Sequence, residues 1–175
     1  MKGRLPSGSS LLIQFPAGPS AEGKKAAEVL AGELRARITL DIHLREQDAA
    51  GSLDSFDLLI HLGVPDTFPD ELLSQIDPPL KIAPFPDYGE HVNLRFLHDG
   101  RPAHILAVAG SDRALIYGAG MLFRFFRFSE EEMYWDLPPS DFQPLTPLRG
   151  CFFNPGSSQN GYRRFSLDQW DHLLA

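Results

Sequence analysis

The chain is poor in cysteine, in clustered positive charge and in long hydrophobic runs, and each lack excludes a class of protein. Its 175 residues include a single cysteine, Cys151, so no disulfide framework can form within the chain. The formal net charge is −7, and Lys and Arg form no cluster of the kind that binds nucleic-acid phosphates. We therefore expect no nucleic-acid partner.

The hydrophobic runs are too short for a membrane segment or a secretion signal. The N-terminus is polar from Met1 to Pro6, and the first apolar run covers only residues 11–15. A membrane-spanning helix needs about 20 apolar residues, and a signal peptide needs an apolar core with a charged flank. We expect no membrane partner and a cytoplasmic protein, while secretion of a longer parent with a leader upstream of Met1 stays open.

Hydrophobic residues make up 43% of the chain, which is enough for one core, and their spacing predicts a mixed α/β domain. The runs 10–15, 40–45 and 57–62 predict strands. Apolar residues recur at helical spacing up to residue 38, which predicts a half-buried helix that Ser20 caps. We expect this helix to connect the first two strands along one face of a sheet.

The middle of the chain predicts a hairpin and a second long helix. The alternating residues 92–96 and the run 104–109 flank Asp99-Gly100, a dipeptide typical of tight turns because it accepts positive φ. A helix begins near Ser111, and Gly118 inside it costs about 1 kcal/mol relative to Ala, so we expect close approach to the sheet there. The predicted fold is α/β, an α+β sandwich with a mixed sheet and two helices packed on one face. A short helix is expected near residues 70–75.

The pattern changes after residue 128. Residues 129–147 contain four prolines and no clear period, which predicts a linker. Beyond it, 148–154 predicts a new strand, and the capping-box pattern at 166–169 opens a further helix. The chain ends at Ala175 inside that helix, so we expect it to be part of a longer protein.

Two stretches carry a resemblance to a known family. The run 105–126 has a strand that ends in small residues and Asp112, then a helix with the pair Tyr117-Gly118 and an apolar continuation. It resembles the end of the accessory domain that precedes the catalytic barrel in β-hexosaminidases and α-glucuronidases. The stretch Pro147-Leu148-Arg149-Gly150 and the helix that opens at Ser166 are similar to the entry into their (β/α)₈ barrel.

The resemblance implies three parts and a function. Residues 1–128 are expected to form the accessory domain, 129–147 the linker, and 148–175 the first strand and helix of a truncated barrel. The acids of these enzymes lie on later barrel strands, so we expect no catalytic residue, metal or cofactor here. The chain itself is then inactive, and it supports the barrel of a parent glycoside hydrolase that cleaves O-glycosyl bonds.

The resemblance also implies how a carbohydrate partner is contacted through the missing barrel. Arg149 occupies the place of the arginine that contacts hydroxyls of the terminal sugar, so it is the first candidate for substrate binding. Asn154 would lie at the carboxyl-terminal face of the barrel, where active sites form, and is the second candidate. The family usually has an acid a few residues after the arginine, whereas Phe153-Asn154 stands here. This departure favours a branch nearer the α-glucuronidases.

Four other features favour structural roles. The stretch 118–120 contains two glycines, but they lie inside a predicted helix and not directly after a strand, where a dinucleotide site needs them. The histidines show no metal-binding spacing; His43 and His61 would face each other if their strands pair, and we interpret them as ordinary core or surface residues. Cys151 fits an inert buried thiol, and the acidic run 130–132 fits a solvated surface.

Two further expectations concern partners. The alternative to the accessory-domain hypothesis is a free-standing carbohydrate-binding or protein-interaction module, while an independent small enzyme ranks last because no catalytic set can be assembled. A homodimer through the C-terminal segment is also expected, because Phe152, Phe153 and Trp170 would be exposed without the rest of a barrel.

Overall fold

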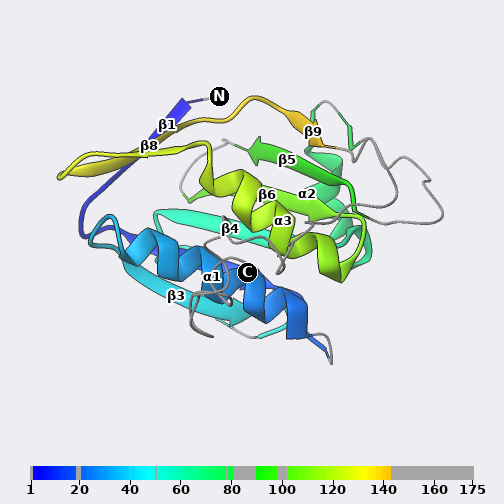
Figure 1. The fold of residues 1–175 in the computed structure, drawn as a ribbon. Coiled ribbons are helices and arrows are strands. Elements are labelled where there is room, and N and C mark those ends of the chain that lie inside the picture. Colours follow the sequence, from blue (N-terminus) through cyan, green and yellow to red (C-terminus); the bar gives the residue numbers. More distant parts are fainter. Residues whose placement is uncertain are drawn as a thin grey trace, which may run out of the picture. The chain divides into compact units, whose positions relative to one another are not determined.

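A six-stranded mixed sheet forms the centre of the fold (Figure 1). The computed structural model describes residues 2–18, 21–49, 51–77, 79–80, 90–97 and 102–142. The strand order is β3 (Asp41–Glu46), β2 (Ser10–Phe15), β4 (Leu58–Gly63), β6 (Ala103–Ala109), β5 (Val92–Leu97) and β9 (Ser140–Phe142). Strands β3, β2, β4 and β6 are parallel to one another, and β5 is antiparallel to both of its neighbours.

Two helices cover one face of this sheet, which we call the helix face (Figure 1). Helix α1 (Ala21–Arg35) buries Ala27, Leu30 and Leu34, and helix α3 (Asp112–Phe123) buries Leu115 and Leu122. Alternate strand residues meet them in one core, among them Leu11, Ile13, Leu58, Ile60, Ile105 and Ala107. The predicted mixed sheet with two helices on one face is confirmed for the described residues.

Gly118 lies where α3 comes closest to the sheet. A Cβ at this position would lie 3.3 Å from Val92 Cγ1 on β5 and 3.6 Å from Ala107 Cβ on β6. The predicted close approach of helix and sheet is therefore confirmed. Gly120 differs, because no atom would lie within 4 Å of a Cβ there.

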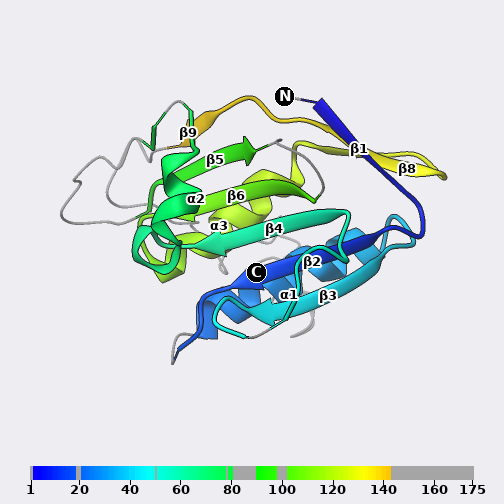
Figure 2. The ribbon, with the colours of Figure 1, turned by 180° about the vertical axis from the view of Figure 1, so that it is seen from behind.

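The other face, which we call the opposite face, is covered by shorter elements (Figure 2). The 3₁₀ helix η1 (Pro65–Thr67) and the short helix α2 (Asp70–Ser74) follow β4, which confirms the short helix expected near residues 70–75. Phe68 and Ile76 from this region pack on Leu106 and Val108 of β6. The connection from β3 to β4 also crosses here. Its residues Leu53 and Phe56 pack with Leu12 and Leu59.

A second, three-stranded sheet has the order β1-β8-β7, and its middle strand lies in the segment predicted to be a linker. Strand β1 (Lys2–Pro6) arises from the polar N-terminus, and β7 (Phe126–Phe128) begins after α3 has ended. Strand β8 (Glu132–Asp136) and β9 lie inside the segment predicted to be a linker. Met133, Trp135 and Leu137 are all buried. Their period of two was a strand signal that the neighbouring prolines and acids obscured.

Several predictions fall on residues outside the described part. The chain divides by its contacts into two units, Met1–Leu145 and Thr146–Ala175, and every described residue lies in the first. The barrel unit 148–175, with Cys151 and the proposed dimer surface, is therefore outside it. So are Ser20 and Asp99-Gly100, although the antiparallel pairing of β5 with β6 that this turn predicts is present. In the described ranges, no helix has the length and apolar character to cross a membrane.

Candidate functional site

The predicted substrate-binding residues, Arg149 and Asn154, lie outside the described residues. Within the described part, the unusual feature is a set of buried polar side chains. The buried polar or charged residues there are Gln14, His61, Asn93 and Arg95, with exposed fractions between 1% and 6%. Strand alternation places all of them on the opposite face, because their neighbours in sequence join the helix-face core. The buried polar side chains of the described residues are therefore concentrated on one side of the sheet.

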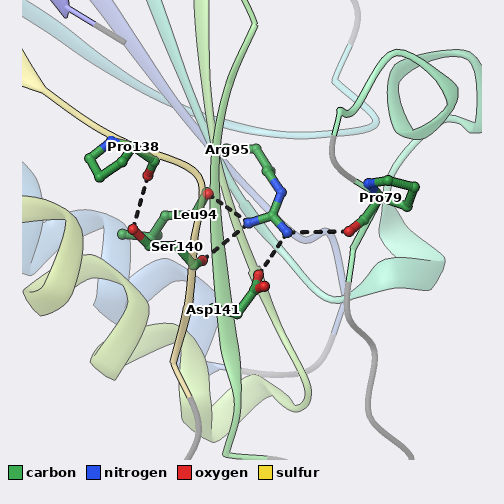
Figure 3. Close-up of polar contacts among 6 residues, drawn as sticks. All are labelled: Pro79, Leu94, Arg95, Pro138, Ser140 and Asp141. Carbon is green, nitrogen blue, oxygen red and sulfur yellow. Dashed lines mark hydrogen bonds and ion pairs between the residues drawn. The ribbon is translucent and has the colours of Figure 1, made fainter.

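Arg95 forms a fully engaged clamp between strands (Figure 3). Its side chain is 2% exposed, and Nη2 lies 2.7 Å from Oδ1 of Asp141 on β9. The guanidinium also donates hydrogen bonds to three backbone carbonyls, those of Leu94 (2.9 Å), Ser140 (3.1 Å) and Pro79 (3.3 Å). A buried arginine with this many partners fastens the short strand β9 to β5. We assign it a structural role.

His61 and His104 form a second polar cluster, on the central strands. Nε2 of His61 lies 3.0 Å from Nδ1 of His104, and the rings are nearly parallel, with centroids 5.1 Å apart. In the sheet register His61 stands opposite Leu106 and His104 opposite Leu59, so the two histidines are diagonal neighbours on one face. The pairing of the two strands in register therefore produces the contact.

His43 and His61 do not face each other, because the strands that carry them do not pair. Strand β2 pairs with both β3 and β4 and separates them. His43 instead lies 3.0 Å from Asp41 and makes an edge contact with the Phe56 ring, with centroids 5.4 Å apart. The position of β2 between these two strands is set by the strand order, which no local sequence pattern indicates.

Both histidines of the pair favour the neutral form. Burial, and to a smaller extent the neighbouring His104, together lower the pKa of His61 to about 3. Burial also lowers the pKa of His104. At neutral pH each ring therefore carries one N–H, and one of the two rings donates to the other.

The pair lines a cavity of about 500 Å³ on the opposite face. Gln14, Gln47, Asp48 and Asp66 contribute polar groups to the lining. Its apolar part includes Leu53, Phe68 and Leu72. None of the described residues that line it is Lys or Arg. The cavity thus combines apolar walls with a few converging polar groups, as small-molecule sites do.

The topology of the sheet accounts for the position of this cavity. Helix α1 connects β2 to β3 along the helix face, whereas the β3–β4 connection packs on the opposite face. The chain therefore adds β3 on one side of β2 and β4 on the other, and the change of direction lies between the neighbouring strands β2 and β4. In open α/β sheets, ligands bind beyond the carboxyl ends of the strands at such a point. Gln14 near the end of β2 and Asp66 just after β4 lie at these ends, whereas His104 is the second residue of β6, so the cavity extends from these ends back along the sheet.

Two other hollows adjoin the three-stranded sheet and are less suited to a site. They have volumes of about 400 and 540 Å³, and both are lined by Lys2, Arg4 and Trp135. Neither contains a titratable side chain that is itself buried. Across the described ranges, no group of three or more His, Cys, Asp or Glu side chains could hold a metal ion. The histidine cavity is therefore the candidate site.

Comparison with known proteins adds no assignment. No model of a known protein family and no curated protein matches this chain.

Proposed function

We propose that this chain is the non-catalytic N-terminal part of a glycoside hydrolase and that it supports the catalytic barrel in carbohydrate hydrolysis. The observation that supports the proposal is the packing of α1 and α3 on one face of a mixed sheet. The resemblance carried by residues 105–126 implies a mixed α/β sandwich of this kind.

The resembling stretch has a physical role in the fold. It covers β6 from Ile105 onward, α3, and the first residue of β7. Within it, Gly118 allows α3 to approach Val92 and Ala107, while Tyr117 beside it is 38% exposed. The glycine of the Tyr-Gly pair thus sets the distance between helix and sheet, which any domain built on this plan requires.

In this proposal the chemistry belongs to residues beyond Ala175. Glycoside cleavage commonly needs two carboxyl groups across one scissile bond, and a barrel holds them at its strand ends. Arg149 and Asn154 are proposed to contact the sugar, and 148–175 is proposed to be the first strand and helix of the barrel. The homodimer through this segment remains part of the same proposal.

The coding DNA directly downstream of Ala175 provides the first test. We expect an open reading frame long enough for a (β/α)₈ barrel, which needs about 250 residues. A stop codon immediately after Ala175 would overturn the accessory-domain proposal. It would favour the alternative of a free-standing carbohydrate-binding or protein-interaction module.

Activity of the full-length product provides the second test. We expect the full-length protein to hydrolyse an aryl glycoside and the 175-residue chain alone to be inactive. Arg149→Met should raise KM for the full-length enzyme by about tenfold or more, because a charged hydrogen bond to a sugar hydroxyl is lost. Arg124→Met is the matched control, since Arg124 is exposed at the end of α3, and KM should stay unchanged.

A further inference from the structure

We propose that the cavity beside His61 and His104 binds an uncharged polyhydroxylated ligand about the size of one sugar unit. This site lies entirely within the described part of the chain, so it goes beyond the accessory role and needs no barrel. The proposal rests on the geometry of the histidine pair and on the residues that line the cavity.

The histidine pair offers matched hydrogen-bonding groups. If His61 Nε2–H donates to His104 Nδ1, then His61 Nδ1 is left as an acceptor and His104 Nε2–H as a donor. If the bond runs in the other direction, the two roles are exchanged. In either arrangement the pair has one further donor and one further acceptor. Neighbouring hydroxyl groups of a sugar can satisfy both, because each hydroxyl both donates and accepts.

The remaining lining suits the same ligand. The side-chain amide of Gln14 is 6% exposed and can both donate and accept. The carboxylates of Asp48 and Asp66 accept hydrogen bonds from hydroxyls. Leu53 and Leu72 provide apolar surface for the C–H groups of a ring. The volume of about 500 Å³ lies within the range of small-molecule sites.

Other ligand classes fit less well. A phosphate or carboxylate group would lie near Asp48 and Asp66, with no Lys or Arg among the described lining residues. A metal ion would need more converging ligands than the two histidine rings, and no group of three ligating side chains occurs in the described part. A neutral ligand that combines hydroxyls with an apolar ring face can contact both the polar and the apolar residues of the lining.

Ligand titrations followed by NMR test the proposal on the 175-residue chain. The probes are glucose and N-acetylglucosamine, which are neutral, and glucuronate, which is anionic and of similar size. We expect at least one neutral sugar to shift the imidazole signals of His61 and His104 saturably, with a dissociation constant on the order of 1 mM. Glucuronate should bind at least about tenfold more weakly, because Asp48 and Asp66 repel it.

Matched variants decide whether the binding occurs at this cavity. His104→Leu should weaken binding of the neutral sugar about tenfold or more, because it removes a hydrogen-bonding group. His43→Leu is the control; His43 is on the same face but outside the lining, and affinity should be unchanged. Should His104→Leu fail to fold, Gln14→Leu tests the same lining from β2 and should weaken binding too.

Three results would overturn the proposal. The first is that neither glucose nor N-acetylglucosamine gives a saturable shift. The second is that glucuronate binds as tightly as the neutral sugar or more tightly. The third is that His43→Leu loses as much affinity as His104→Leu. The outcome is separable from that of the accessory-domain proposal. Sugar binding by the 175-residue chain together with a stop codon after Ala175 would support this site and overturn the role in supporting a barrel.

Discussion

The two faces of the six-stranded sheet are buried in different ways. On the helix face, α1 and α3 pack against strand residues that are all apolar, from Leu11 on β2 to Leu94 on β5. On the opposite face, a short helix, a 3₁₀ helix and a connecting segment provide the cover (Figure 2). Arg95 and His61 are buried on this face. One face of the sheet is therefore apolar where the helices pack, and the other face holds buried polar side chains.

This difference shows that the elements packed on a face of a sheet limit which side chains can be buried there. Long helices close-pack and exclude water, and a polar group without a partner is costly there. Short elements leave gaps and free backbone carbonyls, which can serve as hydrogen-bond partners. Arg95 uses such carbonyls, whereas the histidine pair lies beside a cavity. The opposite face thus contains one polar cluster that joins β9 to β5 and one that lines a cavity.

The largest effect is expected from removing the clamp on the opposite face. Arg95→Met should lower the free energy of unfolding by about 3 kcal/mol, because Asp141 and three backbone carbonyls lose a buried donor. Urea denaturation measures the loss. The control is Arg37→Met, which breaks only the exposed i,i+4 pair with Glu33 and should cost at most about 1 kcal/mol. Equal losses in the two variants would show that the clamp is not structural.

An intermediate effect is expected from acid, through the histidine pair. The unfolded chain takes up the proton of His61 near pH 6.5, and the folded chain takes it up only near pH 3. Between these values the unfolded state binds more protons, so stability falls as the pH falls. From pH 7 to pH 5 this histidine should cost about 2 kcal/mol, and the lowered pKa of His104 acts in the same direction.

Urea denaturation at several pH values checks this expectation with the variant His61→Phe. The comparison uses the slope of stability against pH, since the variant also loses the contact with His104 at every pH. Other titratable groups near the cavity, Asp48 and Asp66, are shared by both proteins and cancel in the difference. We expect a shallower slope for the variant between pH 7 and pH 5. Identical slopes would mean that His61 is not held neutral by burial.

The smallest effect concerns the packing of the helix face. Gly120→Ala should stabilise the fold by about 0.5–1 kcal/mol, because the position is exposed, helical and free of contacts to a new Cβ. Gly118→Ala makes the same chemical change, but its Cβ would press on Val92 at 3.3 Å. We expect it to give no gain or a loss of up to about 1 kcal/mol. Thermal denaturation of both variants measures the difference, and equal gains would contradict the close packing of α3.

Much of the central sheet could be predicted from the sequence because its signals are local. The apolar runs that became β2 and β4, and the helical spacing of Leu30 and Leu34 in α1, each lie within one element. Strands β1 and β9 were missed for the opposite reason. Lys2–Pro6 has little apolar character, and Ser140–Phe142 is three residues long, so each becomes a strand only through pairing with β8 or β5.

The candidate site was less predictable than the fold. Gln14 and His61 are polar residues inside apolar strands, which is a visible signal, but the sequence does not say which strands are neighbours. His61 and His104 are 43 positions apart in the sequence, with α2 and β5 between them, and only the register of β4 on β6 brings the rings together. Neither histidine of the pair was therefore predicted as a site residue from the sequence.

The sequence by itself determined the periodicity of the strands and the amphipathic faces of α1 and α3, because these depend on neighbours within a few residues. The close approach at Gly118 depends instead on Val92 and Ala107 of the sheet. The tertiary structure decided the strand order, the antiparallel addition of β9, and the meeting of His61 with His104. Those features depend on contacts between distant segments, whose free energy includes loop closure and burial summed over the whole sheet. No local pattern encodes that sum.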